Sequence, residues 1–363
     1  MPERRVIGWD VGGAHVKACV LQQGGEVVDV AQWACPLWLG MDQLAPVLRA
    51  ARARWPGMHA ARHAVTMTGE MVDLFADRED GVRRIAAELM QSLGGSVHFY
   101  AGDAGWCDDI DAVAARWEAI ASANWLATAR HAALRFGDGV LIDIGSTTTD
   151  LIAFAQGHVT THSRSDAQRL ASGELVYHGV VRTPLCALAR RIAWRGTPHN
   201  VMNEFFATTA DVYRLTGELN AAHDLHPSAD TGAKDLPATR RRLARMIGLD
   251  ARDGTADDWQ AFALAWRAAQ VEELGGQLKR VTAGQSSSRR ATVVSAGCGA
   301  FLVRDVLENA MTEAADAMAC VDYGRDLARV SAHASPDRDT VQAWAQVCAP
   351  CVAVATLFDG DQR

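Results

Sequence analysis

The stretch from Val140 to Asp150 carries the strongest chemical signal in the chain. Its apolar part, Val140–Ile144, predicts a buried strand, and the glycine and hydroxyl-bearing residues after it predict a turn. Gly145 lets the backbone bend tightly, and successive N–H and hydroxyl groups suit phosphate oxygens. The carboxylates of Asp143 and Asp150 suit a hard cation such as Mg²⁺, held through water. The stretch therefore predicts a phosphate site, with an ordinary turn as the alternative. The hydroxyl-bearing residues are Ser146, Thr147, Thr148 and Thr149, and the first three are the candidate phosphate ligands.

A second glycine turn of this kind lies near the N-terminus. Asp10 follows the first predicted strand, Gly12 and Gly13 form the tip of the turn, and Lys17 lies in the next strand, predicted at 15–21. The turn therefore joins two strands, unlike the strand-to-helix turn of a Rossmann or P-loop fingerprint. An aspartate, two glycines and a lysine in this order suit a phosphate held by backbone N–H groups beside a cation. A plain Gly-Gly hairpin is supported equally well.

A third glycine pair follows a predicted strand at Thr292–Ser295 and precedes a predicted helix. Gly297 and Gly299 would let a flat base, or the helix N-terminus, approach the backbone closely. A lone Gly-x-Gly is a weak signal. Its position after two Asp-x-Gly turns gives it weight.

The polar segment 172–184 is predicted to contact a substrate rather than to be a solvated connector. Pro184 directs Thr183 towards an extended conformation. Arg182 can bind an anion through two hydrogen bonds.

Two further polar residues have structural explanations that compete with a functional role. Asn124 lies in Ser122–Trp125, where helix packing around a buried tryptophan is favoured over a place for Asn124 in a cleft. Asp211 follows Thr208, which can cap a helix that begins near Ala210. A first-turn acid that complements the helix dipole and a catalytic acid are equally supported for Asp211.

The histidines and cysteines do not form a convincing metal site. His223 and His226 are close enough in sequence for one, but the polar stretch 219–234 is better explained as a surface loop. Cys348 and Cys351 form a Cys-x-x-Cys pair without the second pair that a zinc site needs. We interpret them as structural thiols in a terminal helix.

Composition restricts the class of protein. With 363 residues and 49% hydrophobic content, the chain can bury a core large enough for two domains. A net charge of −7 argues against general nucleic-acid binding, which needs a basic face. The chain has no apolar run long enough to span a membrane and no signal peptide at its N-terminus, so a cytoplasmic location is expected.

The order of predicted elements indicates one α/β unit followed by a second. The first domain is expected at 1–138 and the second at 139–337, with a helical insertion at about 185–285. A C-terminal helix at about 338–363 could pack back on the first domain. Other predicted segments are a first strand at 4–9, helices at 41–55, 78–93, 236–247 and 257–282, and a loop at 285–290.

The order of the three glycine motifs resembles that of the actin, sugar kinase and heat-shock seventy ATPase superfamily. The resemblance covers nearly the whole chain. It implies an α/β fold in which two ribonuclease-H-like domains face each other across a cleft. It also implies that the first two motifs are phosphate loops and that the third lies near a nucleotide base.

Within this superfamily the chain is most similar to the hydantoinase A and oxoprolinase branch. The similarity extends to a subgroup linked to one-carbon metabolism with tetrahydromethanopterin and methanofuran. The archaeal member of that subgroup is a methanofuran-biosynthesis synthase, which joins an aminomethylfuran-methyl diphosphate to the phenol of γ-glutamyltyramine and releases diphosphate. The matching segments are Gly12–Lys17, Ser122–Trp125, Asp143–Asp150, Gly173–Tyr177, Arg182–Pro184, Phe206–Thr208 and Asp211-Val212.

One departure from the hydantoinases is informative. They carry a threonine after the two glycines of the first motif and an aspartate three residues further on. Here those positions are Ala14 and Lys17. An amine in place of a carboxylate makes this loop more cationic, which suits a diphosphate and casts doubt on ATP-driven ring opening.

The resemblance implies a mechanism. Mg²⁺ on Asp10 and Asp143, together with Lys17, would stabilise the departing diphosphate, and Gly145–Thr148 would cradle its oxygens. A carboxylate would accept the phenol proton, and an aromatic residue, for which Tyr177 is the candidate, would line the site. The sequence leaves the base open among Asp150, Glu174 and Asp211.

Two other classes of function stay open. One is an ATP-dependent kinase or amidohydrolase, in which the Gly297 loop would hold adenine. The other is a nucleotide-gated binding protein without turnover, which is disfavoured because both phosphate-loop acids are present. The expected partners are a small phosphorylated substrate and an aromatic amine or amino-acid acceptor, with Mg²⁺ and without a favoured role for ATP. The sequence does not determine the exact acceptor, although the basic helix around Arg240 would suit an acceptor with an acidic tail. It does not determine the oligomeric state either, and a homodimer is one possibility.

Overall fold

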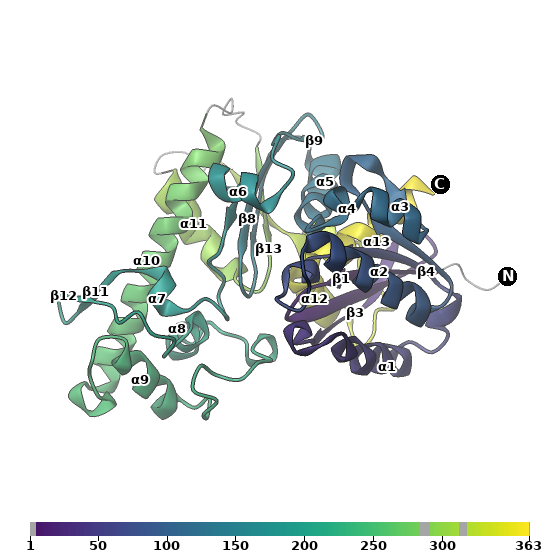
Figure 1. The fold of residues 1–363 in the computed structure, drawn as a ribbon. Helices are drawn as coiled ribbons and strands as arrows, with labels where there is room; N and C mark the ends of the chain where they lie inside the picture. Colours follow the sequence, from purple (N-terminus) through teal and green to yellow (C-terminus); the bar gives the residue numbers. More distant parts are fainter. Residues whose placement is uncertain (1–4, 284–290, 312–317, 363) are drawn as a thin grey trace. The chain divides into compact units, whose positions relative to one another are not determined.

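The computed structural model describes residues 5–283, 291–311 and 318–362 (Figure 1). The predicted loop at 285–290 and the start of the first predicted strand, Arg4, lie outside the described residues. Two compact units emerge from the contacts within the chain, and each is built from segments distant in sequence. The first unit contains residues 1–141, 152–169 and 320–363, and the second contains 142–151 and 170–319.

The first unit is built on a six-stranded sheet in the order β3-β2-β1-β4-β5-β6. The first three strands form an antiparallel meander, and β4 and β5 continue the sheet in parallel with β1. This mixture, with the chain's first strand at the centre, is the topology of a ribonuclease-H-like sheet. The strands are β1 (Val6–Val11), β2 (His15–Gln22), β3 (Glu26–Ala34), β4 (Arg62–Met67), β5 (Ser96–Tyr100) and β6 (Trp106–Cys107).

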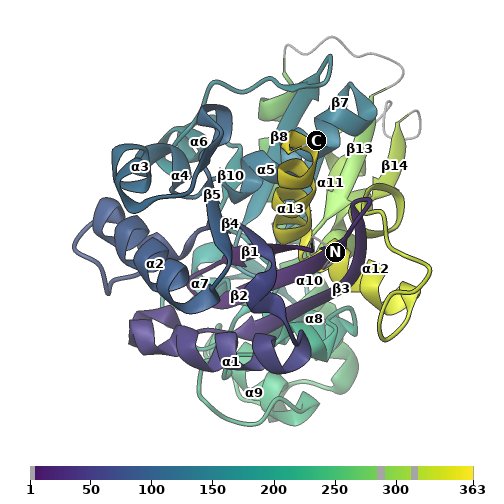
Figure 2. The same ribbon diagram turned by 90° about the vertical axis from the view of Figure 1, so that its right-hand side faces the viewer.

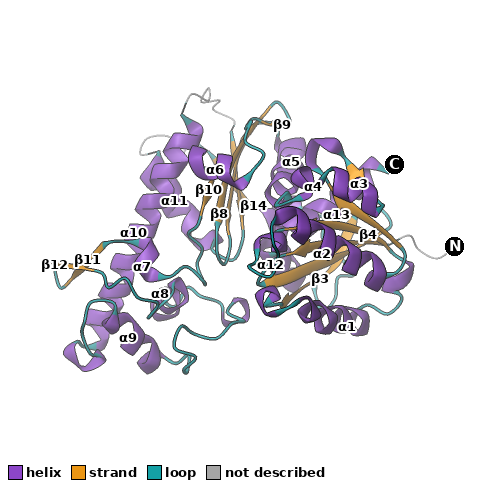
Figure 3. Ribbon diagram, viewed as in Figure 1, coloured by secondary structure: helices purple, strands orange, loops and turns teal. Residues whose placement is uncertain are grey.

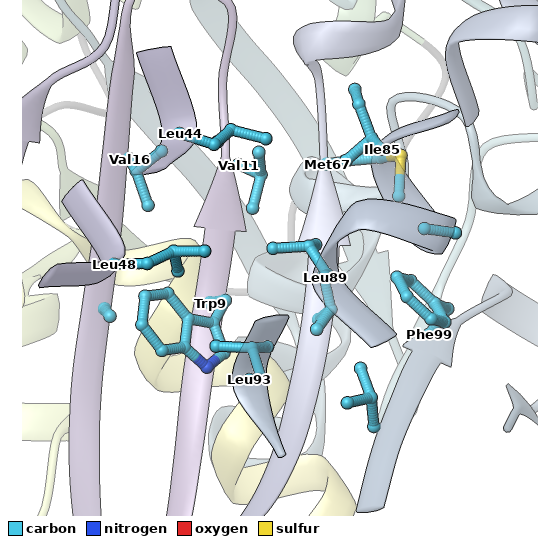
Figure 4. Packing of buried hydrophobic residues seen from close by; sticks show 14 of the residues in the cluster. Trp9, Val11, Val16, Leu44, Leu48, Met67, Ile85, Leu89, Leu93 and Phe99 are labelled. Carbon is cyan, nitrogen blue, oxygen red and sulfur yellow. The ribbon is translucent and has the colours of Figure 1, made fainter. Parts of the chain in front are cut away.

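Helices α1 (Leu44–Arg54) and α2 (Arg78–Leu93) contribute to the core on one face of this sheet. Figure 4 shows Trp9 of β1 among the aliphatic side chains of both helices. The opposite face of β1 carries Gly8, because side chains alternate along a strand. A Cβ at Gly8 would lie 2.7 Å from Ala355 Cβ, so helix α13 (Ala349–Asp361) packs directly on the strand there (Figure 2).

The second sheet has the order β10-β8-β7-β13-β14, with β9 paired to β8. With the two-residue β9 left out and the other strands numbered in chain order, the order is third, second, first, fourth and fifth, the same as in the first sheet without β6. Two sheets of one topology confirm the predicted fold class, α/β with two ribonuclease-H-like parts. The strands are β7 (Gly139–Ile144), β8 (Thr149–Ala155), β9 (His158–Val159), β10 (Leu175–Val176), β13 (Thr292–Ala296) and β14 (Ala319–Asp322).

The regular elements between β10 and β13 are mostly helices, together with a small hairpin (Figure 3). The hairpin packs on the long helix α10 (Ala256–Thr282), where the rings of Trp194 and Trp259 lie 4.2 Å apart. Residues 185–192 divide between a short helix and a strand. The elements are α7 (Leu185–Leu188), β11 (Arg191–Trp194), β12 (Thr197–Asn200), α8 (Thr209–Thr216), α9 (Leu236–Arg245) and α10 (Ala256–Thr282), and α11 (Val303–Ala310) follows β13.

The C-terminal segment forms two helices rather than one, α12 (Arg338–Val347) and α13. Cys348 and Cys351 flank the start of α13 as buried free thiols, which confirms their structural interpretation. In the described part of the chain no single helix is long and apolar enough to cross a membrane, and α12 with α13 passes that test only as a pair bent by 98°. The remaining α-helices are α3 (Ile110–Ala115), α4 (Trp117–Ile120), α5 (Asn124–Phe136) and α6 (Asp166–Ser172).

Candidate functional site

The turn between β7 and β8, residues 145–148, is a tight hairpin that we call the hydroxyl turn. The Gly145 N–H donates to Thr148 O at 2.8 Å and closes it. The Ser146 and Thr147 hydroxyl oxygens lie 3.4 Å apart. All four residues are half-buried, so their N–H and hydroxyl groups lie on a partly accessible polar loop of the kind that binds anions.

The third glycine motif packs against the strand that leads into the hydroxyl turn. The Gly299 N–H donates to Ile144 O at 2.8 Å. Gly297 has a φ of +85°, and a Cβ there would lie 2.5 Å from Asp143 Oδ1. Glycine is required at this position for its backbone conformation and for the close approach of the aspartate. The second and third motifs of the sequence thus meet in one unit.

Residues 179–183, which we call the strap, lie along the hydroxyl turn. The N–H groups of Val181 and Arg182 donate to Ser146 O at 3.0 and 2.8 Å, and the Val180 N–H donates to Gly145 O at 3.0 Å. These three backbone bonds join the polar segment predicted to contact substrate to the predicted phosphate turn.

Side chains of the strap also reach the turn. Arg182 Nη1 donates to Thr147 Oγ1 at 3.3 Å, so a guanidinium lies beside the hydroxyl. Burial lowers the pKa of Arg182, but an arginine stays cationic at neutral pH. Thr183 Oγ1 accepts from the Gly179 N–H at 2.8 Å, which closes the strap on itself. Tyr177, just before the strap, is 53% exposed.

The first glycine turn, residues 11–14, lies in the other unit, and we call it the first loop. Its Gly12 N–H donates to His15 O at 2.9 Å, and Asp10 and Lys17 are direct cross-strand partners on either side of it. Lys17 Nζ lies 3.9 Å from Asp10 Oδ2. A carboxylate, an amine and a glycine tip therefore occur together, as the spacing predicts.

Comparison with known proteins places the chain in a family. The sequence profile of the hydantoinase/oxoprolinase family matches residues 62–329. The chain belongs to the hydantoinase/oxoprolinase family. Its first 61 residues, which contain the first loop, lie outside the matched segment.

Two curated relatives and one solved structure resemble this family member over much of their length. The (4-{4-[2-(gamma-L-glutamylamino)ethyl]phenoxymethyl}furan-2-yl)methanamine synthase of Methanocaldococcus jannaschii is 28% identical over 254 residues, 70% of this chain and 74% of the relative. The synthase of the same name from Methanococcus vannielii is 28% identical over 172 residues, 46% of this chain and 74% of the relative. Nucleotide-free acetone carboxylase matches with a TM-score of 0.51 and 11% identity, over 86% of this chain and 67% of that one, a likeness in fold alone.

The three candidate carboxylates of this hydantoinase/oxoprolinase protein have different surroundings. Asp150 is half-buried on β8, where it is the register partner of Leu175. Glu174 is buried and accepts a hydrogen bond from Ser172 Oγ at 2.7 Å. Asp211 is 1% exposed on α8, in the network described next.

Asp211 is held on several sides. It forms a capping box with Thr208, and its Oδ1 accepts from Arg242 Nε at 2.8 Å and from Arg214 Nη1 at 2.9 Å. Burial raises the pKa of Asp211, and the two arginines oppose that shift. Arg242, on the basic helix around Arg240, is fully buried in this network. One charge of α9 is therefore used inside the fold.

Sequence reasoning missed Gln270, which supports the strap. Gln270 is 1% exposed on α10, accepts from Tyr213 OH at 2.7 Å and donates to Gly179 O at 3.1 Å. Its signal in the sequence is a polar residue on the stripe formed with Trp266 and Leu274 at four-residue spacing.

Asn124 and the histidine pair do not join these sites in the described contacts. Asn124 is the first residue of α5, half-buried, and its carbonyl accepts from Thr128 Oγ1. Among the described residues, no group of three or more histidine, cysteine, aspartate or glutamate side chains is arranged to hold a metal ion. His223 and His226, on the polar stretch between α8 and α9, are therefore not part of such a group among the described residues.

Proposed function

We propose that this protein is a synthase of methanofuran-type cofactor biosynthesis. It would condense an aminomethylfuran-methyl diphosphate with the phenol of a tyramine or tyrosine derivative. The observation that carries the proposal is the match to two relatives whose names describe a phenoxymethyl-furan ether. A half-buried hydroxyl turn with a guanidinium beside it supports the proposal, because a diphosphate leaving group needs donors and positive charge.

The proposed reaction forms one C–O bond and breaks another. The phenol oxygen bonds to the furan methylene carbon, and the bond from that carbon to the diphosphate oxygen breaks with its electron pair leaving on the diphosphate. The phenol proton passes to a protein carboxylate. The chain must therefore bind the diphosphate before and during its departure and place a base beside the phenol.

We assign the diphosphate leaving group to the second unit, where the N–H and hydroxyl groups of the hydroxyl turn and the Arg182 guanidinium would contact its oxygens. The first loop, considered within its own unit, offers backbone N–H groups and Lys17 that would also suit a diphosphate. Gly297 and Gly299 would act through Asp143 and Ile144, which they hold in place.

The carboxylates present fit Mg²⁺ rather than a protein-only metal cage. Mg²⁺ is usually held by one or two carboxylates, with water and substrate phosphate completing the shell. Asp143, half-buried beside the hydroxyl turn, and Asp10 at the first loop are each suited to such a role. When bound, the ion would neutralise charge on the leaving diphosphate.

Asp150 is our assignment for the base. Asp211 is buried and bonded to two arginines, so protonating it would take one counter-charge away from each of them. Glu174 is buried and bonded to Ser172. Asp150 lies on β8 directly after the hydroxyl turn and is half-buried, so a phenol can approach it. Tyr177 is exposed enough to contact the acceptor.

A second candidate is an ATP-dependent kinase or amidohydrolase, and of these two the family match favours the amidohydrolase. The experiment that separates the two is a Mg²⁺-dependent incubation of the full chain with the furan diphosphate and γ-glutamyltyramine or tyrosine, without ATP. Mass spectrometry should detect the ether, and inorganic diphosphate should appear in equal amount. Strict dependence on ATP, with ADP formed and no ether, would refute the synthase.

A pair of threonine variants tests whether the hydroxyl turn takes part. Thr147→Val removes the hydroxyl beside Arg182 and should lower kcat/KM by about 10- to 100-fold, the effect of a hydrogen bond to a charged group. Thr282→Val removes a hydroxyl that donates to Leu278 O within α10 and should leave kcat/KM near wild type. Equal effects of the two substitutions would count against the assignment.

A further inference from the structure

The first loop packs against a second turn, formed by residues 68–72. A Cβ at Gly69 would lie 3.3 Å from the carbonyl carbon of Gly12, and a Cβ at Gly13 would lie 2.7 Å from Val72 Cγ1. These approaches are tighter than most side-chain contacts, so the 68–72 turn touches the first loop through the backbone of Gly69 and the side chain of Val72. A shift of the 68–72 turn must therefore move the first loop.

Glu70, in the middle of the 68–72 turn, is a buried charged residue that the proposed reaction does not use. Its side chain is 1% exposed. Oε1 accepts from Ser122 Oγ at 2.7 Å and from Arg78 Nη2 at 3.1 Å, and the same Nη2 donates to Ser122 Oγ at 3.0 Å. The three groups form a closed triangle of hydrogen bonds.

The partners of Glu70 come from distant parts of the first unit. Arg78 is the first residue of α2 and lies 3.6 Å from Asp166 of α6. Ser122 lies between α4 and α5 with a φ of +52°, a left-handed conformation that is unusual for a residue with a Cβ. Its neighbour Ala121 bridges Met67 at the end of β4. Glu70 thus links the 68–72 turn to the start of α2 and to the connection between α4 and α5.

Burying this triangle of hydrogen bonds costs free energy that a purely stabilising role would not explain. Glu70 Oε2 and Arg78 Nε are also buried, and neither has a hydrogen-bond partner within the described residues. Burying charges with incomplete bonding is expensive, and well-packed apolar side chains are often as stable. Strained and imperfectly bonded groups tend to persist where a fixed geometry matters for function. The Ser122–Trp125 motif therefore has a role that helix packing alone does not explain.

We propose that Glu70 is a positioning residue, which fixes the 68–72 turn and through it holds the first loop in the conformation that binds a diphosphate. The inference rests on the proposed function, because it takes diphosphate as the ligand of the first loop. Ser122 and Arg78 act with Glu70 as its fixed partners.

The chain offers a matched control in the same unit. Asp29 of β3 is 8% exposed and accepts from Arg54 and from Trp55 Nε1, with distances of 2.7 Å. Like Glu70, it is a buried carboxylate bonded to one arginine and one neutral side-chain donor, and it also accepts from the Val30 N–H. It belongs to a different part of the sheet, outside the 68–72 turn.

The test measures binding of inorganic diphosphate, with Mg²⁺, to the full chain by titration calorimetry. Glu70→Ala should raise Kd by about 10- to 100-fold, the scale of a loop misplaced by about 1 Å. Glu70→Gln keeps an oxygen acceptor for Ser122 and Arg78, so it should restore Kd to within about threefold of wild type, because a neutral acceptor keeps most of the hydrogen bonding. Asp29→Ala should lower Tm without raising Kd.

Equal rises in Kd for Glu70→Ala and Asp29→Ala, or a lower Tm with unchanged Kd for Glu70→Ala, would overturn the inference. If Glu70→Ala does not fold, Ser122→Ala replaces it as a milder variant, with a rise in Kd expected and an unchanged Kd counting against the inference. A wild-type chain that binds no diphosphate also overturns it. If the wild-type chain binds diphosphate, and Glu70→Ala weakens that binding, but no ether is formed, the proposed function is refuted and this inference stands.

Discussion

Gly179 is the position at which a single added methyl group should test the hydroxyl turn most directly. A Cβ at Gly179 would lie 2.5 Å from Ser146 O and closer still to the Ser146–Thr147 peptide atoms. Ordinary contacts begin at about 3.4 Å, so strap and turn must separate by more than about 0.9 Å. Gly179 does not have a positive φ, so the effect of alanine comes from this overlap and not from backbone strain.

The overlap sets the expected size of the effect. Overpacking of this kind typically costs about 1–3 kcal/mol of unfolding free energy. A displacement of about 1 Å at a site that must bind a leaving group can cost about 100-fold in rate. We therefore expect Gly179→Ala to lower kcat/KM by about 100-fold and to lower the urea midpoint modestly. The stability change alone would leave most molecules folded.

Gly276 provides the control for this substitution. It lies within α10, and a Cβ there would meet no atom within 4 Å. Gly276→Ala should raise the unfolding free energy by up to about 1 kcal/mol, since alanine is the better helix former, and should leave kcat/KM unchanged. Steady-state kinetics of ether formation and urea denaturation measure both quantities. Wild-type kcat/KM in a folded Gly179→Ala protein would show that the contact between strap and turn does not matter for the reaction.

Three further outcomes are expected. Gln270→Leu removes the side-chain donor to Gly179 O, so the unfolding free energy should fall by about 1–3 kcal/mol and kcat/KM should also fall. A wild-type kcat/KM in this variant would contradict the role of Gln270. Lys17→Met should raise the Kd of inorganic diphosphate by about 10-fold or more in calorimetry, and an unchanged Kd would remove Lys17 from the proposed site. Burial lowers the pKa of His63 from 6.5 to about 4, and Trp9 Nε1 donates to its Nδ1, so the neutral ring is the folded form. The unfolded chain then binds the proton more tightly, so the unfolding free energy should decrease as pH falls from about 6.5 to about 4, and His63→Gln should flatten that slope in urea titrations.

The helices and strands that the sequence predicted most accurately are those whose local sequence signals agree with their packing in the fold. Helix α2 begins and ends at the predicted residues, because Asp77 caps its first turn and its apolar face is periodic. The β11–β12 hairpin was missed because its strands have four residues each and include Pro198. Their packing against Trp259 of α10 is a long-range contact that no local pattern encodes.

In the candidate site, the residues that could be predicted from the sequence are those whose reactive groups lie together in one short segment. The hydroxyl turn and the Gly297 motif could be predicted because glycines, hydroxyls and an aspartate stand together in the chain. Gln270 and Glu70 could not be predicted, because their roles depend on hydrogen-bond partners that are distant in the sequence. Glu70 meets Ser122 across 52 positions, and Gln270 meets Gly179 across 91.

The same dependence on distant partners explains why the sequence left the base open. Asp150, Glu174 and Asp211 are equivalent as residue types, and only their surroundings separate them. Asp211 stabilises a helix start and is one of two carboxylates, with Asp230, that balance the fully buried Arg242, so protonating it during turnover would remove part of the counter-charge of that guanidinium. A base must change its charge in every cycle, and a half-buried carboxylate next to solvent can do so at lower cost than one enclosed by the fold. Asp150 meets that requirement, and Asp211 is the residue that the architecture can least allow to titrate.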